Sequence, residues 1–187
     1  MGRSLWIMAL VCGWLGVVGI GFGAMVNWEN TPGEQGSPPA RWPEASRIAR
    51  TGRATLVIAA HEHCPCTLAT LREISKVLRR SPDADVDVWA VIDGSEPSEV
   101  ADAAAEFPWL HVLRDRDAAE LRLFDGLTSG EVSLYGADGA LRYHGGVTGS
   151  RGREGANPGA AALLSAILKH DGPRAAPVYG CAIQGGA

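Results

Sequence analysis

The sequence predicts an α/β domain, a three-layer sandwich with a mixed central sheet, preceded by one N-terminal transmembrane helix. Three observations support this prediction. Short apolar runs alternate with amphipathic segments over residues 51–175, an Asp-Gly turn joins the last two strand-like runs, and a long apolar segment opens the chain. Alternating strands and helices are typical of a sheet covered by helices, and a closing hairpin adds antiparallel strands to that sheet.

The opening apolar segment extends from Leu5 to Val26 and is almost uncharged. It is long enough to cross a bilayer core of about 30 Å as a helix. Arg3 precedes it, whereas Glu29 and Glu34 follow it, so the positive-inside rule directs the rest of the chain away from the cytoplasm. We predict a single-pass protein of the cytoplasmic membrane, with its C-terminal domain in the periplasm or outside the cell. A cleaved signal peptide is the alternative.

Composition divides the chain into four parts. Residues 1–27 are predicted to be a transmembrane signal anchor, 28–50 an extended linker with four prolines, 51–175 the folded domain, and 176–187 a flexible C-terminal tail. The net charge of −4 is spread over interspersed acidic and basic residues and gives no reason to expect a nucleic acid partner. Membrane attachment is therefore assigned to the N-terminal helix and not to surface charge.

The domain begins with a predicted strand and helix. Residues 54–60 form an apolar, partly β-branched run without glycine or proline, which predicts a buried strand. Pro65 suits the first position of a helix, where a missing N–H group costs nothing. Apolar residues then recur at spacings of three and four, namely Leu68, Leu71, Ile74 and Leu78. This periodicity predicts an amphipathic helix.

The remaining elements continue the alternation. Ser95 or Ser98 is a possible cap for the second helix of the domain, and Asn157-Pro158 caps the last one. The predicted strands cover residues 85–92, 109–113, 131–135 and 140–144, and the predicted helices cover 97–107, 117–124 and 157–168. Function in open α/β sheets usually lies at the carboxyl ends of the strands, and the first strand ends at the segment described next.

The six residues from His61 to Cys66 read His-Glu-His-Cys-Pro-Cys. The pattern places Cys64 at or beside the helix N-cap and Cys66 in the first turn, where the positive end of the helix dipole favours thiolate over thiol. A disulfide between cysteines one residue apart would be strained and easily reduced. We therefore predict redox chemistry at Cys64 and Cys66, with His63 and His61 as supporting residues that manage protons.

A third cysteine lies outside the membrane segment. Cys181 follows Pro177-Val-Tyr-Gly near a glycine-rich end, in a compartment where disulfides persist. An odd number of thiols is natural for a site that exchanges disulfides. Cys181 is therefore a candidate resolving partner for Cys64, and an unrelated thiol in the tail is the alternative.

Taken together, the strand, the Cys-Pro-Cys helix start, the alternating elements and the closing hairpin and helix resemble the thioredoxin-like superfamily, especially its membrane-anchored extracytoplasmic members. The resemblance covers about residues 50–171. It implies a thioredoxin-like sandwich, with Cys64 as the exposed attacking thiol and Cys66 near the resolving position. Redox members of the superfamily usually carry Cys-x-x-Cys and a cis-proline before the hairpin; here residues 127–132 contain no proline.

Copper handling is the main alternative function. Residues His61, His63, Cys64 and Cys66 offer soft and borderline donors within one short segment, with His144 as a possible distant ligand. Membrane-anchored thioredoxin-like proteins that deliver copper resemble this chain in general plan. A thioredoxin-like domain that only binds a partner is a second alternative.

We therefore predict a thiol-disulfide oxidoreductase that needs no cofactor, copper being the alternative. Its predicted partners are protein or small-molecule thiols and disulfides, together with an unnamed redox partner. The glycine-rich stretch from 145 to 155 reads as a loop, and Arg151 and Arg153 within it would stabilise a thiolate if they border the site.

Overall fold

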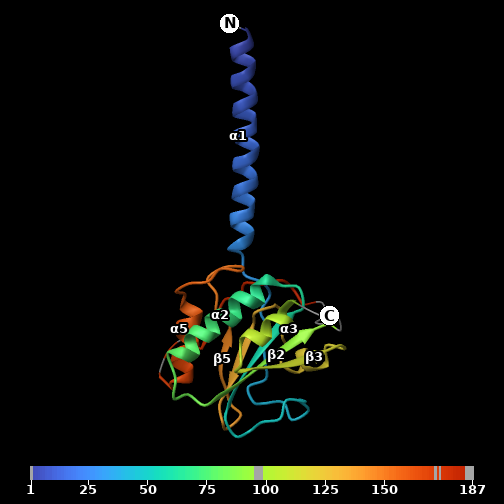
Figure 1. Ribbon diagram of the computed structural model, residues 1–187, viewed down its shortest axis with the longest axis vertical. Coiled ribbons are helices and arrows are strands. Elements are labelled where there is room, and N and C mark those ends of the chain that lie inside the picture. Colours follow the sequence, from blue (N-terminus) through green and yellow to red (C-terminus); the bar gives the residue numbers. More distant parts are fainter. Residues whose placement is uncertain (1, 95–98, 171, 173, 184–187) are drawn as a thin grey trace. The chain divides into compact units, whose positions relative to one another are not determined.

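The computed structural model describes residues 2–94, 99–170, 172 and 174–183 and divides the chain into two compact units, Met1–Thr31 and Pro32–Ala187. The helices and strands, drawn in Figure 1, are α1 (Gly2–Glu29), β1 (Ala54–His61), α2 (Pro65–Arg79), β2 (Val86–Asp93), α3 (Glu99–Ala103), the 3-10 helix η1 (Ala104–Glu106), β3 (Leu110–Asp115), α4 (Ala119–Leu123), β4 (Val132–Tyr135), β5 (Leu141–Gly145), α5 (Pro158–Ile167) and β6 (Ala175–Ala176).

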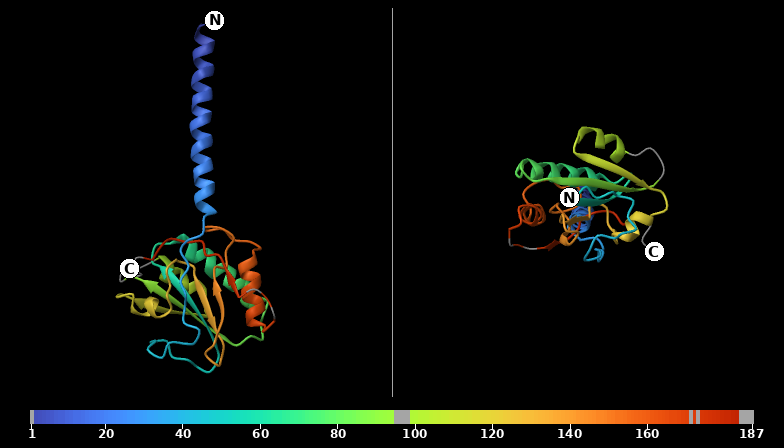
Figure 2. Two further views of the ribbon diagram at one scale, coloured as in Figure 1. Left: turned by 180° about the vertical axis from the view of Figure 1, so that it is seen from behind. Right: turned by 90° about the horizontal axis from the view of Figure 1, so that it is seen from below.

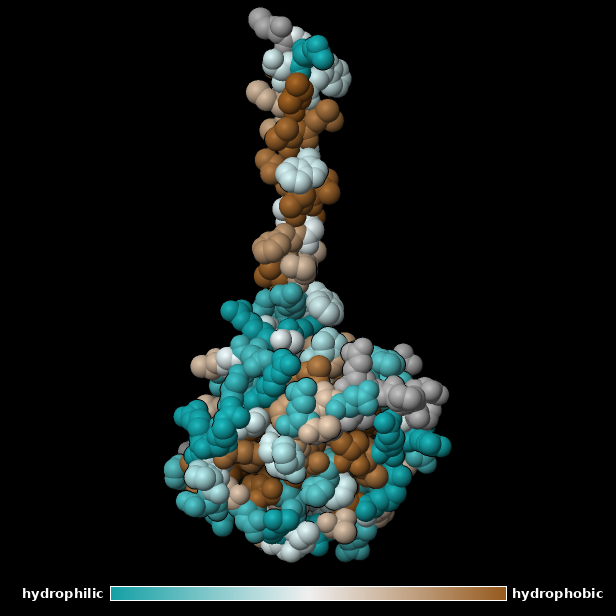
Figure 3. Space-filling model, viewed as in Figure 1, coloured by the Kyte–Doolittle hydropathy of each residue, from teal (hydrophilic) through white to brown (hydrophobic). Residues whose placement is uncertain are grey.

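The first unit is essentially the helix α1. Its 28 residues include an 18-residue window with a mean hydropathy of 2.1, and apolar side chains cover much of the visible face of its middle part (Figure 3). Within the described residues it is the one helix long and apolar enough to span a membrane. The predicted span from Leu5 to Val26 falls inside it.

The second unit contains a mixed six-stranded sheet in the order β3-β2-β1-β4-β5-β6. β1, β2 and β3 are parallel neighbours, whereas β4 runs antiparallel to both β1 and β5. The fold class predicted from the sequence is confirmed. The short strand β6, which pairs in parallel with β5, was not predicted, because two alanines carry no periodic signal.

The sheet has apolar side chains on both faces. Leu56 and Ile58 of β1 pack with Leu71 and Ile74 of α2 and with Leu163 of α5 on one face. On the other face, a cluster includes Val57, Val91, Phe124, Tyr135 and Ile48. β1 is therefore buried on both sides, which explains why its sequence is continuously apolar and not alternating.

The segment predicted as an extended linker packs onto the second face of the sheet. Trp42 makes edge-on contacts with the rings of Phe124 and Tyr135, and Ile48 is buried. Backbone hydrogen bonds also join this segment to the β4–β5 hairpin, from Trp42 N to Gly139 O and from Leu141 N to Ala40 O. From Pro32 onward the segment is thus part of the compact unit.

The other helices are shorter than predicted. α3 ends at Ala103 and is followed by η1, and α4 has five residues instead of the eight predicted over 117–124. The proposed caps Ser95 and Ser98 lie outside the described residues. α5 begins at Pro158, and the side chain of Asn157 accepts a hydrogen bond from Ala160 N, as predicted for its cap.

Candidate functional site: a cluster of three thiols

Cys64 lies where β1 ends and α2 begins. It is the N-cap of α2, with an extended backbone at φ −94° and ψ 113°, and Pro65 occupies the first helical position. Its amide donates to His61 O at 3.2 Å, and its carbonyl accepts from Thr67 N at 3.0 Å. The predicted helix start is confirmed. The Cys64 side chain makes no capping hydrogen bond, so its sulfur is available for other partners.

Two thiols, one backbone amide and one hydroxyl donate hydrogen bonds to the Cys64 sulfur. The Cys66 thiol has the largest effect on the pKa of Cys64. The Cys181 N–H, the Ser129 hydroxyl and the Cys181 thiol lower this pKa further. Together these donors lower the pKa of Cys64 to about 4, although burial acts in the opposite direction. Cys64 is therefore a thiolate at neutral pH, the form of cysteine that attacks disulfides.

The two other thiols stay protonated. The hydrogen bond to Cys64 raises the pKa of Cys66, and burial together with the nearby negative charge raises it further. Burial, followed by the hydrogen bond and charge of Cys64, raises the pKa of Cys181. The cluster thus holds one negative charge on Cys64 and two thiol donors beside it.

The site is closed, which corrects one expectation. The resemblance implied an exposed attacking thiol, but Cys64 is only 2% exposed and Cys66 only 4%. The reason is tertiary: Ser129 and Cys181, from segments far away in the sequence, both contact the Cys64 sulfur. Pro65, between the two cysteines, is exposed.

Ser129 is a site residue that the sequence analysis missed. Its hydroxyl oxygen accepts from His61 N at 3.0 Å and lies 2.7 Å from the Thr67 hydroxyl, and both Ser129 and Thr67 are completely buried. The loop that carries it is fixed to β1 by Gly130 N to Ala59 O and Ala59 N to Glu131 O, each 2.8 Å. The only sequence signal for Ser129 was that it lies within residues 127–132, the segment before the hairpin where redox members of the superfamily usually have a cis-proline.

The C-terminal segment brings Cys181 to the site. Ser129 N donates to Cys181 O at 2.9 Å and Ile183 N donates to Leu127 O at 2.8 Å, so this segment runs antiparallel to the loop before β4. Val178 and Ile183 are buried at 1% and 6% exposure. The described part of the predicted tail therefore lies against the domain, and its course along one end of the sheet can be followed in red in Figure 2.

The glycine-rich loop after β5 also borders the cluster. The Gly152 N–H donates to the Cys66 sulfur, and the charge of Arg151 partly opposes the rise in the pKa of Cys181. Arg151 thus lies near the thiols, as the sequence allowed. Arg153 is exposed, and its backbone amide donates to Ser150 O.

The three histidines considered as site residues, His61, His63 and His144, have different surroundings. His61 Nδ1 accepts from the His63 amide at 3.3 Å, and the His63 ring is 59% exposed beside Glu62. His144 is only 12% exposed, and its Nε2 lies 2.6 Å from a carboxylate oxygen of the buried Glu131. His144 is therefore neither a solvated histidine nor a ligand beside the thiols; it belongs to the support of the β4 loop.

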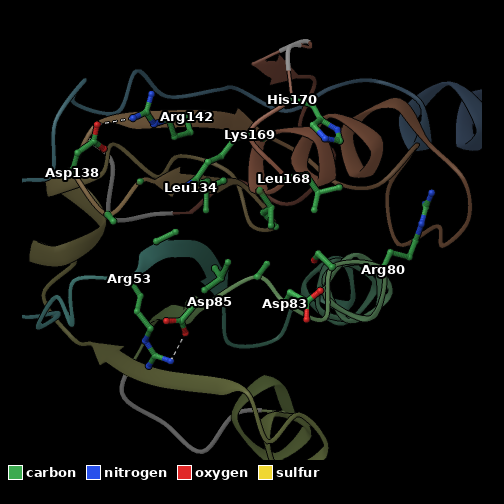
Figure 4. A pocket seen from close by; sticks show the side chains of 18 of the residues that line it. Arg53, Arg80, Asp83, Asp85, Leu134, Asp138, Arg142, Leu168, Lys169 and His170 are labelled. Atoms are coloured by element: carbon green, nitrogen blue, oxygen red, sulfur yellow. Dashed lines mark hydrogen bonds and ion pairs between the residues drawn. The ribbon is translucent and has the colours of Figure 1, made fainter.

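Other candidate sites were compared with the thiol cluster. Across the described ranges, no group of three or more His, Cys, Asp or Glu side chains has an arrangement that could hold a metal ion. A cavity of about 1100 Å³ opens at the opposite end of the sheet, where β1 and β2 begin (Figure 4). Its charged side chains include the ion pairs Arg53–Asp85 and Arg142–Asp138, and the thiols lie elsewhere.

Comparisons with known proteins bear on the fold. No protein-family model matches the chain, and no curated protein sequence matches it significantly. A conserved protein from Geobacillus kaustophilus aligns with a TM-score of 0.58 and 17% identity over 82% of this chain and 92% of its own. A hypothetical protein from Sinorhizobium meliloti 1021 aligns with a TM-score of 0.59 and 18% identity over 82% and 96%.

A third solved structure, an uncharacterized thioredoxin-like protein from Porphyromonas gingivalis, aligns with a TM-score of 0.49 and 20% identity over 66% of this chain and 78% of its own. The mixed central sheet, the antiparallel β4–β5 hairpin and the cysteine at the start of the helix after β1 agree with the resemblance described from the sequence. The domain has a thioredoxin-like fold.

Proposed function

We propose that this protein is a membrane-anchored thiol-disulfide oxidoreductase that acts outside the cytoplasm through Cys64. The observation that carries the proposal is the contact of the Cys64 sulfur with two neighbouring thiols, one backbone amide and the Ser129 hydroxyl, which together favour its thiolate. A nucleophilic sulfur with further thiols in contact has what disulfide exchange requires: an attacking group and a group that releases the product.

In the proposed reaction, the Cys64 thiolate attacks one sulfur of a substrate disulfide R–S–S–R′. The S–S bond of the substrate breaks, a mixed disulfide Cys64–S–S–R forms, and R′–S⁻ leaves and takes a proton from solvent. A second thiol of the cluster then attacks the Cys64 sulfur, releasing R–SH and leaving a disulfide in the protein. The substrate gains two electrons, and the protein loses two. A redox partner reverses the change in the protein.

The stabilised thiolate also affects the direction of exchange. A thiol with a low pKa is a good leaving group, and stabilisation of the reduced form makes the corresponding disulfide more oxidising. This favours the reverse of the reaction written above, in which the disulfide of the protein oxidises substrate thiols, or the isomerisation of substrate disulfides. Strong reduction is disfavoured, in agreement with the strain expected at Cys-Pro-Cys. His63, exposed next to Cys64 in the sequence, is the proposed proton donor and acceptor for departing substrate thiols.

The proposed location rests on α1 and on the flanking charges. A 28-residue apolar helix is long enough to remain in the membrane as an anchor, and Arg3 near its N-terminal end directs the domain outward. Disulfides form and persist in extracytoplasmic compartments, so a protein that exchanges disulfides has substrates there.

Thiol trapping tests the function. The full-length protein, in detergent micelles, is equilibrated in glutathione buffers of graded ratio, quenched with acid and labelled with a mass-tagged maleimide. We expect a reversible two-electron couple that is lost in Cys64→Ser and retained in Cys12→Ser, the matched control in α1. Thiols that stay reduced at every ratio would contradict the proposed function.

Cu(I) binding is the second candidate, because the three sulfurs contact one another and thiolates favour Cu(I). In this alternative, Cys64 and Cys66 bind the metal with His61 or His63. Anaerobic loading with Cu(I) followed by metal analysis tests it. Stoichiometric binding lost in both Cys66→Ser and His63→Ala would support a copper site; the exchange function predicts no such dependence on His63.

A further inference from the structure

Residues 178–183 form a strap across the thiol site. Three backbone hydrogen bonds hold it: Gly33 N to Val178 O, Ser129 N to Cys181 O and Ile183 N to Leu127 O, between 2.8 and 2.9 Å. Val178 and Ile183 anchor its two ends in the domain. Gly180 lies so close to Ser129 that a Cβ at this position would be 1.8 Å from the Ser129 carbonyl oxygen, so the close approach requires glycine.

The strap presents Cys181 directly to Cys64. Both the amide and the thiol of Cys181 donate to the Cys64 sulfur. Cys181 is of intermediate exposure, whereas Cys64 is only 2% exposed. Cys181 therefore covers the Cys64 sulfur and also places a second thiol in contact with it.

Cys66 is less suited to form a disulfide with Cys64. The two are separated by Pro65 alone, whose ring fixes its φ angle at the first position of α2. A disulfide needs a near-perpendicular dihedral, and the helix start restricts the backbone adjustments that would provide it. Cys66 is also held in place by the Gly152 N–H, which donates to its sulfur.

Given the proposed function, on which this inference rests, we infer that Cys181 is the resolving thiol and that the strap covers Cys64 until a substrate displaces it. The strap opens, Cys64 attacks the substrate disulfide R–S–S–R′, and R′–S⁻ leaves. The strap then returns, and the Cys181 sulfur attacks Cys64 in the mixed disulfide. The Cys64–Cys181 bond forms, the Cys64–R bond breaks, and the Cys181 proton passes through solvent to R–S⁻.

In this scheme Cys66 has a positioning role. Its thiol donates to the Cys64 sulfur in the reduced state and thereby keeps Cys64 ionised, without becoming part of the disulfide. A short segment held by three backbone hydrogen bonds is suited to local opening, because it opens at lower free energy than a fully paired core strand.

Disulfide mapping tests the inference. The full-length protein is oxidised with glutathione disulfide, quenched with acid, alkylated with N-ethylmaleimide and digested with trypsin. Cleavage after Arg53, Arg72 and Arg174 yields one peptide, 54–72, that contains Cys64 and Cys66, and another, 175–187, that contains Cys181. We expect the two peptides to be disulfide-linked.

Variants identify the partner sulfur. The linked pair should persist in Cys66→Ser and in the control Cys12→Ser and be lost in Cys64→Ser, whose folding is checked by its thermal unfolding. Cys181→Ser should accumulate Cys64 as a mixed disulfide with glutathione. A bond within peptide 54–72, or a linked pair that survives Cys64→Ser, would overturn the inference while leaving disulfide exchange in place. The absence of any disulfide would overturn the proposed function as well.

Discussion

At the scale of single residues, Cys64 combines burial with a negative charge. Burial alone would raise the pKa of a thiol, yet the Cys66 thiol, the Cys181 amide and the Ser129 hydroxyl reverse the effect. The sulfur is thus ionised where water has little access, and its reactivity depends on a small number of hydrogen bonds from three separate segments.

The first prediction concerns the pH dependence of Cys64. Because its pKa is lowered to about 4, the thiolate is almost fully formed above about pH 5, so its alkylation rate should be flat from about pH 5 to 8. An ordinary thiol would gain about tenfold in rate per pH unit below its pKa near 8.5. Iodoacetamide labelling of peptide 54–72, read by mass spectrometry, measures the rate; a tenfold rise per unit over this range would contradict the lowered pKa.

The second prediction concerns Ser129. Ser129→Ala removes a hydrogen bond to a charged sulfur, a contribution of about 1.5–3 kcal/mol, so the pKa of Cys64 should rise by about 1–2 units. The same labelling profile measures it. Ser133→Ala on β4 deletes the same group at a buried position of the sheet ladder and serves as the control. Equal profiles for Ser129→Ala and Ser133→Ala would exclude a role for the Ser129 hydroxyl.

At the scale of elements, the site depends on two extended segments that approach the start of α2. The loop before β4 carries Ser129, and the strap carries Cys181. Glu131 holds the first of these: its carboxylate accepts from Leu127 N at 2.9 Å, Thr128 N at 3.2 Å and Gly36 N at 2.8 Å, and it pairs with His144.

The third prediction tests that support. Glu131→Ala leaves three backbone amides and His144 without their acceptor, so the free energy of unfolding should fall by about 3–5 kcal/mol. Asp138→Ala is the control, because it removes a carboxylate from the exposed pair with Arg142 and should lower the free energy of unfolding far less. Urea unfolding of the two variants measures both values. Similar losses would mean that Glu131 does not fix the loop.

The fourth prediction concerns strap opening. Ile183 is 6% exposed and anchors the end of the strap, so Ile183→Ala should favour the open state by about 1–2 kcal/mol and speed alkylation of Cys64 roughly 5- to 30-fold. Leu168→Ala, at an exposed apolar position just after α5, should leave the rate unchanged. An unchanged rate in Ile183→Ala would show that the strap does not limit access.

At the scale of the whole molecule, the Cys64–Cys181 couple would connect the first strand–helix junction of the domain to the C-terminal segment. Closing a loop of about 100 residues reduces the entropy of the unfolded chain and stabilises a folded protein by about 4–5 kcal/mol in the chain-entropy model. A bond between Cys64 and Cys66 would close a loop of only a few residues and would stabilise the folded protein far less.

The fifth prediction follows. The cross-link stabilises the oxidised protein, whereas the hydrogen-bonded Cys64 thiolate stabilises the reduced one. Cys66→Ser removes the main donor to that thiolate, so in this variant the oxidised protein should unfold several degrees above the reduced one. In Cys181→Ser, which cannot form the Cys64–Cys181 bond, this difference should be absent. Differential scanning calorimetry of the two redox states measures it. A difference that depends on Cys66 and not on Cys181 would favour the short disulfide.

The sequence by itself determined the elements whose signals are local. The apolar run of β1, the spacing of Leu71 and Ile74 in α2 and Pro65 at its first position predicted the strand, the helix and the N-cap at Cys64, because each signal depends on neighbours within a few residues. The length of the apolar run likewise predicted the long apolar helix α1. These local signals, with the order of the elements, were sufficient for the fold class.

Only the tertiary structure decided the state of the site. That Cys64 is buried, that Ser129 contacts it and that Cys181 lies beside it depend on contacts between residues 65 and more than 100 positions apart. The backbone hydrogen bonds that create these contacts, such as Ser129 N to Cys181 O, use groups that every residue except proline has, so they leave almost no mark on the sequence. The Cys-Pro-Cys segment indicated thiol chemistry; the packing of two distant segments made it a closed site with a third thiol.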